Sequence, residues 1–541
     1  MNMPLRDQTL ESLTFDNRFV QELPPDPQPK NYRRQVSGAC YSRVLPTTVS
    51  SPKLVTHSRE AAGLLNLSEE SCESSLFTEI FAGNNLLSGM DPFAMCYGGH
   101  QFGNWAGQLG DGRAINLGDV INSQQERWTL QLKGAGPTPY SRQADGLAVL
   151  RSSIREFLCS EAMYHLGIPT TRALSVITTG ELVERDMFYD GHPKDEPGAV
   201  VCRVAPSFLR FGNYEILASR GETDLLKKLV DYTIRTDFPH LGEPSVTCYT
   251  AWFKEICQTT AAMIIHWMRV GFVHGVMNTD NMSVLGLTID YGPYGWLEGY
   301  DAQWTPNTTD ARGRRYCYSN QPQIGQWNLL QLANAIYPLV KQVEPFQEAL
   351  AYYNTLFLKG WNDMMAAKLG LKTFSAETDD TLIGELVEIL QLVETDMTIF
   401  FRQLASITTS SKVQSGNNIP AAISEAHYKP EEITESYRHR MNSWLQSYIK
   451  RLEHDKLPHD KLPDELRRQK MNSINPKYVL RNYLAQLAID KAEEGDNSMV
   501  IELLDLLRNP YEEQPERDHF AAKRPEWARN RAGCSMLSCS S

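Results

Sequence analysis

The sequence predicts an α+β fold in which a strand-rich N-terminal part precedes a helix-rich C-terminal part. Between about residues 90 and 220, Gly-rich turns alternate with short runs of period-two hydrophobicity and one strong helical pattern. Between about 250 and 400 the hydrophobic period is mostly helical. The chain has 541 residues, more than one average core needs, so we expect at least two cores.

Composition and charge exclude several classes of protein. Hydrophobic residues make up 42% and charged residues 22%, which excludes global disorder. A net charge of -12 gives no general attraction to nucleic acid or anionic lipid, so we expect neither as a partner. The most apolar run, AAMIIHWMRVGFVHGV, is interrupted by His266, Arg269 and His274, too early for a membrane span. The N-terminus fits no targeting signal, and ten scattered cysteines are typical of a reducing compartment, so we expect a cytoplasmic location.

Local composition divides the chain into five segments. They are an extension that wraps the body (1–85), a strand-rich lobe (86–220), a helical lobe (221–405), a further helical extension (423–530) and a tail that contains cysteine (531–541). The polar, Gly/Ser/Asn-rich stretch from about 406 to 422 predicts an exposed loop between the helical segments.

A Gly-rich turn is the first candidate for a phosphate site. AGQLGDGRAINLG places Gly107, Gly110 and Gly112 between FAMCY and RAINL, two runs able to form strands. Glycines let a backbone turn tightly and point successive N–H groups at an anion. Arg113 follows directly and could add a charged fork. Taken alone, such a turn is more often only a hairpin connection.

A strand lysine and a helix glutamate come next in the chain. Alternation in RWTLQLK puts Gln131 and Lys133 on the same strand face, with Lys133 at the strand end. The following helix, DGLAVLRSSIREFLCSEAMYHLGI, has Asp145 as its plausible N-cap and offers Glu156 and Glu161 as partners for the lysine. The alternative is a surface glutamate that pairs with an arginine of its own helix. Gly-rich turn, lysine and glutamate occur in this order in the N-terminal lobe of a protein kinase.

The stretch GFVHGVMNTDNMSVLGLTIDYGPYGW carries the candidate metal ligands. It presents Asp280 and Asn281 in a turn, continues through a short apolar strand, SVLGLTI, and ends in Asp290-Tyr-Gly. Asn281 and Asp290 offer the hard oxygen ligands that hold Mg²⁺ against nucleotide phosphates. His274 and Asn281 have the spacing of the kinase pattern HRDxxxxN, but Val276 stands where the catalytic aspartate belongs. These motifs together predict a bilobal protein-kinase-like fold with a mixed β-rich N-lobe, a helical C-lobe and additional C-terminal helices.

Two arginines lie between the halves of this pattern. VVCRVAPSFLRFGNYE places Arg203 in a predicted strand and Arg210 in the turn after it, from which both could reach one anionic ligand. An ordinary kinase does not need this pair, which hints at phosphates placed differently. The alternative is a structural role for each.

The longest of these strings resemble one protein family. YGGHQFGNWAGQLGDGRA, LQLKGAGPTPYSR, AVLRSSIREFLCSEAMYHLGIPTTRAL, HGVMNTDNMS and TIDYGPYG closely resemble the selenoprotein O family, also known as the YdiU family. The resemblance runs from about residue 30 to 330 and reappears at the C-terminal Cys-Ser-Ser. It implies a kinase-like fold and transfer of AMP from ATP to Ser, Thr or Tyr hydroxyls of proteins, with UMP transfer attributed to some members. It also implies an ATP that is flipped relative to kinases, so that the α-phosphate is attacked.

The resemblance assigns expected roles residue by residue. It implies nucleotide contacts from Gly110, Gly112, Arg113, Lys133, Asp145, Gly146, Arg203, Arg210 and Asp290. It implies Glu156 as the partner of Lys133, Asp280 as the proton acceptor, and Asn281 and Asp290 as ligands of Mg²⁺ or Mn²⁺. A carboxylate beside a metal has a lowered pKa, which makes it a weak base.

The tail cysteines suggest a redox device. Cys539 occupies the position where eukaryotic members of the resembled family carry selenocysteine, and Cys317 lies where a kinase activation segment would. The hypothesis is a reversible disulfide between Cys317 and Cys539, or between Cys534 and Cys539. The alternative is a set of inert thiols.

Three classes of function remain open at this point. They are an AMP or UMP transferase, a conventional kinase, and a catalytically silent pseudokinase that acts as a scaffold. Val276 argues against the conventional kinase, and the retained Lys133, Glu156, Asn281 and Asp290 argue against the scaffold.

Overall fold

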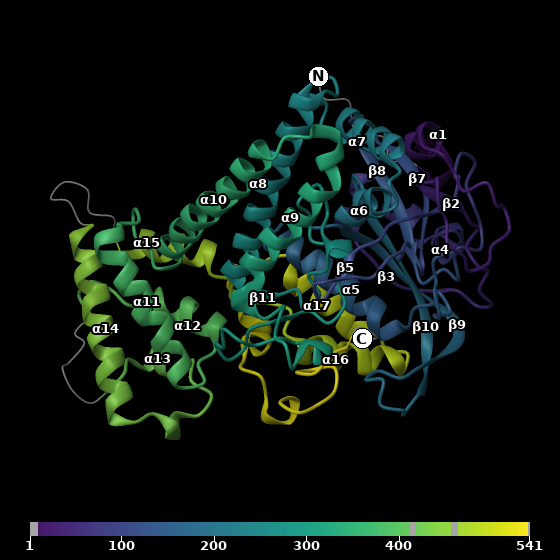
Figure 1. Ribbon diagram of the computed structural model, residues 1–541. Coiled ribbons are helices and arrows are strands. Elements are labelled where there is room, and N and C mark those ends of the chain that lie inside the picture. Colours follow the sequence, from purple (N-terminus) through teal and green to yellow (C-terminus); the bar gives the residue numbers. More distant parts are fainter. Residues whose placement is uncertain (1–8, 412–417, 456–463, 539–541) are drawn as a thin grey trace, which may run out of the picture.

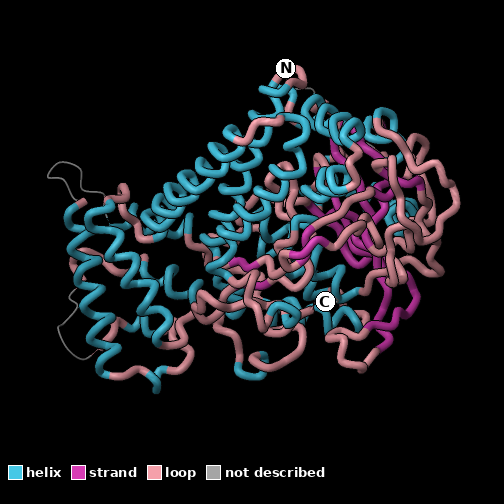
Figure 2. Tube along the Cα trace, viewed as in Figure 1, coloured by secondary structure: helices cyan, strands magenta, loops and turns pink. Residues whose placement is uncertain are grey.

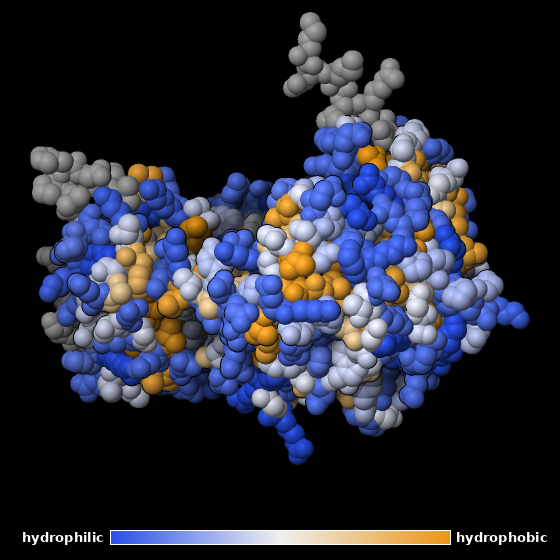
Figure 3. Space-filling model, turned by 45° about the horizontal axis from the view of Figure 1, so that its top comes forward, coloured by the Kyte–Doolittle hydropathy of each residue, from blue (hydrophilic) through white to orange (hydrophobic). Residues whose placement is uncertain are grey.

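The computed structural model describes residues 9–411, 418–455 and 464–538 (Figure 1). It confirms the predicted α+β class, because the strands gather in one region built mainly from the N-terminal half while long helices form most of the rest (Figure 2). On the face in Figure 3 most of the surface is hydrophilic, and hydrophobic residues form separate patches. Among the described residues, no helix is long and apolar enough to cross a membrane.

One antiparallel sheet organises the N-terminal half. Its strand order is β2-β4-β7-β8-β10-β9-β3, and β1 pairs with β7 off this path. The strands are β1 (Thr14–Phe15), β2 (Tyr41–Arg43), β3 (Lys53–His57), β4 (Phe93–Met95), β7 (Ala114–Ile121), β8 (Arg127–Lys133), β9 (Arg172–Arg185) and β10 (Lys194–Ala205). The centre of the sheet is therefore made of β7, which follows the predicted turn, and of β8 and β10, which carry the predicted lysine and arginine.

Alternation along β8 decides which side chains face the site. Leu130 and Leu132 are fully buried, and the C-cap of α4 (Ser75–Ala82), Gly83, lies against Leu132. Lys133 faces the other way and meets Glu156 of α5 (Leu150–His165), a helix that lies across β9 and β10. Because successive residues of a strand face opposite sides, α4 and α5 cover opposite faces of the sheet.

Helices make up most of the remaining chain (Figure 1). They include α6 (Phe211–Ser219), α7 (Thr223–Asp237), α8 (Val246–Val270), α9 (Gln321–Val340), α10 (Glu344–Lys368), α11 (Ala376–Leu392), α12 (Met397–Leu404), α14 (Glu435–His454), α15 (Asp464–Ile474), α16 (Asn482–Glu493) and α17 (Ser498–Leu507). The part of the apolar run AAMIIHWMRVGFVHGV from 261 to 270 lies in α8, which ends where Gly271 adopts a left-handed conformation, φ 76°.

The C-terminal helices return to the sheet region. Both α16 and α17 pack against α5, as Figure 1 shows, and Arg508 just after α17 donates to Glu60 over 2.7 Å. Buried apolar side chains from Leu10 to Cys534 consequently form one continuous cluster within the described residues. Helices distant in sequence thus bury their apolar faces against the same sheet-associated helix, and the expectation of at least two cores stays a prediction.

Two local expectations are wrong. Asp145 does not cap α5, which begins at Leu150 with Val149 as an N-cap without a side-chain bond. The stretch SVLGLTI forms no strand, because the chain turns at Gly286, where φ is +66° and the amide N–H bonds back to Ser283. Apolar content misled the strand prediction, since it does not distinguish a buried turn from a buried strand. The cap prediction failed because residues after Asp145 are extended, with bridges from Leu147 to Ala135 and from Val149 to Gly198.

Candidate active site

A buried ionic cluster lies where β8 ends. The Lys133 ammonium donates to Glu156 Oε2 over 2.5 Å, and Arg203 on β10 donates to Glu156 Oε1 over 3.0 Å. Lys133 also lies 3.8 Å from Asp290 Oδ1. The structure thus brings together the predicted lysine and glutamate, while Glu161, the other candidate, binds elsewhere.

Asp290 joins this cluster to the helical part of the molecule. Arg203 donates to one carboxylate oxygen of Asp290, and Arg210, the N-cap of α6, donates to the other over 2.5 Å. The same Arg210 nitrogen donates to the backbone carbonyl of Asp280 over 2.9 Å. Burial alone would raise the pKa of Asp290, but Arg210, Arg203 and Lys133 outweigh it and hold that pKa well below its usual range. Asp290 is therefore ionised.

The ion pairs of the cluster contain more cations than carboxylates. Three cations, Lys133, Arg203 and Arg210, meet two carboxylates, those of Glu156 and Asp290. The buried Nε of Arg203 has no hydrogen-bond partner within the described residues. An uncompensated cation and a free buried donor both favour an anionic ligand.

The Gly-rich turn lies directly beside the lysine. Ala114 is the strand partner of Lys133, and the carbonyl of Arg113 accepts from the amide of Gly134 over 2.7 Å. The Arg113 side chain forms no hydrogen bond or ion pair with the described residues, so it is available to an anion. Its position beside the cluster adds a fourth cation.

The glycines of the turn are needed for packing. A Cβ at Gly110 would collide with the ring of Tyr140, and one at Gly112 would lie 3.0 Å from the Tyr140 carbonyl oxygen. Gly146 has φ +80° and packs against Gly136, whose amide donates to the Gly146 carbonyl over 3.1 Å. The Gly-rich turn and the Asp145-Gly146 segment therefore pack closely against the chain that follows Lys133.

Asp145 is engaged by an arginine. Its carboxylate accepts two hydrogen bonds from Arg185, over 2.7 and 2.8 Å, and one from the amide of Leu147 over 2.9 Å. The Asp145 side chain is 43% exposed and that of Arg185 is 16% exposed, so this two-bond pair lies at the protein surface. The Asp145 carboxylate, predicted to contact the nucleotide, is therefore already paired with Arg185.

Asp280 lies in a short 3₁₀ turn, η3 (Thr279–Asn281). Its Oδ2 accepts from Gln101 over 3.2 Å, and its buried Oδ1 has no hydrogen-bond partner among the described residues. Burial raises the pKa of Asp280 to about 7, against the lowering effect of Gln101 and Arg210. The lowered pKa expected for a carboxylate beside a metal concerns the metal-bound site and stays a prediction.

The residues predicted to hold a metal offer suitable donors. The Asn281 side-chain nitrogen donates to the Val276 carbonyl over 3.0 Å, which leaves the amide oxygen of Asn281 for a ligand. Asp290 supplies an ionised carboxylate. One nitrogen of Arg210 donates both to the Asp280 carbonyl and to the Asp290 carboxylate, so it connects the loops that carry these residues. An amide oxygen and a carboxylate fit the oxygen preference of Mg²⁺ and Mn²⁺.

Comparison with known proteins decides the family. A sequence model described as protein adenylyltransferase SelO matches residues 30–508. A protein nucleotidyltransferase YdiU of Rhodopirellula baltica is 62% identical, and the match covers 98% of this chain and 99% of that protein. Proteins of the same name from Aromatoleum aromaticum and Flavobacterium johnsoniae are 59% and 56% identical, each over 98% of this chain and 100% of theirs.

The chain belongs to the protein adenylyltransferase SelO family. The predicted resemblance is confirmed, and the chain is an enzyme, a protein nucleotidyltransferase of a family that uses ATP as substrate.

Several residues of this SelO-family site escaped sequence reasoning. Gln131 accepts from Arg203 and donates to Asn116 over 3.0 Å, and the ring of Tyr97 lies 4.6 Å from the Arg210 guanidinium. The alternation in β8 was a usable signal for Gln131, since it places that residue on the Lys133 face. No local pattern indicated Tyr97, because its contact joins segments more than a hundred residues apart.

A glycine of the string YGGHQFG has a steric role at Asp280. A Cβ at Gly99 would lie 2.7 Å from Asp280 Oδ1 and 2.9 Å from Asp280 Cβ. A Cβ at Gly212, in the first turn of α6, would collide with the carbonyl oxygen of Gly98. These glycines let the Gly98–Gly99 segment lie against the loop that holds Asp280.

The structure describes only two of the three cysteines in the disulfide hypothesis. Cys317 and Cys534 are both buried free thiols, and Cys539 lies outside the described residues. Burial raises the pKa of Cys534 to about 11, which disfavours its reactive thiolate. Cys317 contacts Gln303 and Ser319 through its sulfur. The proposed pairing with Cys539 stays a prediction.

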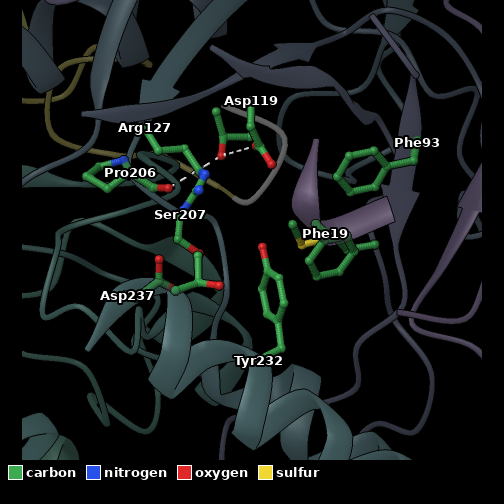
Figure 4. Close-up of a pocket in the computed structure, with 11 residues that line it drawn as sticks. Phe19, Phe93, Asp119, Arg127, Pro206, Ser207, Tyr232 and Asp237 are labelled. Atoms are coloured by element: carbon green, nitrogen blue, oxygen red, sulfur yellow. Dashed lines mark hydrogen bonds between the residues drawn. The ribbon is translucent and has the colours of Figure 1, made fainter. Parts of the chain in front are cut away.

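A second, enclosed hollow lies further along the same sheet face. In Figure 4 Asp119 and Arg127 of the sheet face Tyr232 and Asp237 of α7. Thr129 on β8 donates to Asp119 over 2.7 Å, and it lies two alternation steps from Lys133. The hollow is thus separate from the ionic cluster, and its charged groups belong to the packing of α7 on the sheet.

Proposed function

We propose that this chain transfers AMP from ATP to Ser, Thr or Tyr hydroxyls of proteins and releases pyrophosphate. The observation that carries the proposal is the group of three cations, Lys133, Arg203 and Arg210, around the ionised Asp290. It lies beside Asp280, a buried carboxylate with an unpaired oxygen. Triphosphate binding and proton removal can therefore occur at adjoining positions.

We further propose that the two parts of the molecule form a kinase-like bilobal body. Supporting features are the pair between strand Lys133 and helix Glu156 and the Asp290 loop that faces it from the helical part. The position of a kinase base is taken by Val276, which is buried, 7% exposed, and cannot accept a proton. This difference favours nucleotidyl transfer over phosphoryl transfer to a hydroxyl.

The reaction forms one bond and breaks one. The substrate hydroxyl oxygen attacks the α-phosphorus, the bond from that phosphorus to the bridging oxygen breaks, and pyrophosphate leaves. The hydroxyl proton would pass to Asp280, whose buried Oδ1 has no hydrogen-bond partner among the described residues. Negative charge grows on pyrophosphate, and Arg113, Lys133, Arg203 and Arg210 would stabilise it by on the order of a few kcal/mol each.

Asn281 and Asp290 would hold Mg²⁺ or Mn²⁺. A bound divalent ion supplies charge neutralisation for the phosphates. Phosphate oxygens would then compete with Asp290 for Arg203 and Arg210, which the chain presents already oriented by Gln131 and Tyr97. Arg203 and Arg210 would thus hold the flipped triphosphate.

Labelled nucleotides test the proposal. The chain is incubated with Mg²⁺ or Mn²⁺ and with ATP labelled on the α- or the γ-phosphate, or with UTP labelled on the α-phosphate, and protein-bound label is measured. Label from the α-position of ATP alone supports AMP transfer, and a preference for UTP supports UMP transfer. Label from the γ-position indicates a kinase, and no label indicates a scaffold; either result overturns the proposal.

An Asp290→Ala variant tests the site. It should abolish transfer because it removes a metal ligand, deprives Arg210 of its carboxylate partner and leaves Arg203 with Glu156 alone. Glu388→Gln removes one carboxylate from an exposed ion pair on α11 and should leave transfer unchanged. Circular dichroism of both variants separates loss of the site from loss of the fold. Transfer by Asp290→Ala would contradict the metal assignment.

A further inference from the structure

A polar groove opens beside the Asp280 loop, outside the ionic cluster. It is lined by Gly313, Arg315, Asn320, Gln323, Ile324 and Trp327, from the segment before α9 and from the first turns of that helix. Trp327 also contacts the ring of His100, which belongs to the hairpin of β5 (His100–Gln101) and β6 (Asn104–Trp105). The groove is therefore formed by the start of α9 and the segment before it, and the hairpin adjoins it through Trp327.

Arg315 is the charged group of this groove and is incompletely paired. Its Nε and Nη2 are buried and have no hydrogen-bond partner within the described residues. Its guanidinium lies 4.6 Å from the ring centre of Trp327, which fixes its position by a cation–π contact. The neighbouring carboxylate of Asp310 accepts the backbone N–H groups of Arg315 and Tyr316. Buried guanidinium donors without partners are costly, so a carboxylate that reaches them would be stabilised by a charge-assisted hydrogen bond.

The groove is close to the proposed base. A Cβ at Gly103 would lie 3.3 Å from the Arg315 guanidinium carbon, so the hairpin turn touches Arg315. Two residues earlier, Gln101 donates to Asp280 Oδ2 over 3.2 Å. Two residues of chain span at most about 7 Å, so the hairpin turn that touches Arg315 lies close to the residue that binds Asp280. A peptide in the groove can thus present a hydroxyl to Asp280.

The surrounding charge selects the partner. Arg312 and Arg314 are exposed, and their side chains form no hydrogen bond or ion pair with the described residues. Together with Arg315 they place three cations in four residues of a chain whose net charge is -12. A basic patch on an acidic protein attracts acidic segments by charge complementarity.

We propose that this groove docks the protein substrate and that Arg315 binds an Asp or Glu side chain near the target hydroxyl. The proposal rests on the proposed function, since it names the class of protein segment that the same site modifies. Arg315 would act as a specificity residue, and Trp327 would cover the apolar part of the docked segment.

Fluorescence anisotropy with two peptides tests the docking directly. One fluorescent peptide carries Ser, Thr and Tyr flanked by Glu residues, and its counterpart has Gln at every Glu position. The Glu peptide should bind about tenfold more tightly to the unmodified chain, because a charge-assisted hydrogen bond is formed only with Glu. Arg315→Gln should abolish this preference, whereas Arg440→Gln, which removes an exposed guanidinium from α14, should retain it.

A double variant and a measurement of label transfer distinguish failure of the docking surface from failure of the proposed function. Arg312→Gln with Arg314→Gln changes only exposed side chains and should reduce the preference in part. Equal binding of the two peptides to the unmodified chain, or an unchanged preference in Arg315→Gln, would overturn the docking surface. Transfer of α-label from ATP is measured on the same peptides. Absence of transfer together with a preference that depends on Arg315 would overturn the proposed function and leave the docking surface standing.

Discussion

At the scale of single residues, the ion pair with Glu156 helps the buried Lys133 side chain to stay charged and so to bind phosphate. Burial lowers the pKa of Lys133, and the carboxylate of Glu156 opposes this effect. Glu156 also forms an ion pair with Arg203, so its negative charge keeps a partner when Lys133 is removed. The fold is therefore less dependent on Lys133 than the chemistry is.

Replacing Lys133 by Met should lower AMP transfer at least about a hundredfold, because one preorganised cation is lost from the leaving pyrophosphate. Incorporation of α-label from ATP measures the effect, and thermal unfolding checks the fold. Lys53→Met changes an exposed lysine at the start of β3 and serves as the matched control. Wild-type transfer by Lys133→Met would contradict the phosphate role.

The hollow of Figure 4 contains a second residue with an unusual charge state. Burial raises the pKa of Asp237 to about 7, against the lowering effect of Arg127. The folded chain then binds a proton that the unfolded chain has already released between about pH 4 and pH 7. The free energy of unfolding consequently falls as the pH rises through this window.

Asp237→Asn should remove this pH dependence. A shift of about three pKa units corresponds to on the order of 4 kcal/mol, so the variant should gain stability relative to the unmodified chain by up to that amount between pH 4 and pH 8. Urea unfolding at several pH values measures the difference. A difference that is constant with pH would show that Asp237 is ionised in the folded chain at every pH tested.

At the scale of elements, the hairpin of β5 and β6 positions the Asp280 loop. His100 donates its amide to the Thr279 side chain over 2.7 Å, Gln101 donates to Asp280, and Gly99 lies against the Asp280 side chain. The loop is thus held by contacts between two short elements that are far apart in sequence.

Gly99→Ala should displace Asp280 and lower transfer more than about tenfold, since misplacing a catalytic group by about 1 Å is costly. Gly384→Ala in α11 has open space around the new Cβ and should stabilise the helix by up to about 1 kcal/mol without changing transfer. Rates and thermal unfolding are measured for both variants. Unchanged transfer by Gly99→Ala would mean that the loop tolerates the shift.

The same scale shows what sequence patterns could predict. Strict alternation located β8 with its correct face, and helical spacing located α5 with Glu156. Apolar content failed for SVLGLTI, because Gly286 turns the chain inside a buried segment. Periodicity reports burial on one face of an element, and it does not report turns that are themselves buried.

At the scale of the whole molecule, the C-terminal helices support the helix that carries Glu156. Arg481, the N-cap of α16, is buried and donates to Asp396 over 2.8 and 3.1 Å. Asp396 also caps α12 and accepts from Tyr428 over 2.8 Å. The ion pair between Arg481 and Asp396 therefore joins α16, which packs on α5, to α12.

Arg481→Met should destabilise the chain by about 3–5 kcal/mol, because it leaves the Asp396 carboxylate buried without its cation. The double variant with Asp396→Asn should lose less, since the buried charge is removed and Asn can still cap α12. Arg531→Met breaks an exposed pair with Asp490 and should cost less than about 1 kcal/mol. Denaturant unfolding measures all three, and equal losses for Arg481→Met and Arg531→Met would contradict the argument.

The sequence by itself determined the α+β class, the strand that presents Lys133, the helix that presents Glu156 and the family of the chain. These follow from local periodicity and from long motifs, which are properties of neighbouring residues. Only the tertiary structure decided that Arg203 and Arg210 converge on Asp290, that Asp280 is buried enough to raise its pKa to about 7, and that α16 and α17 brace α5. Charge pairing and burial depend on segments far apart in sequence, so their energies appear only when the chain is folded.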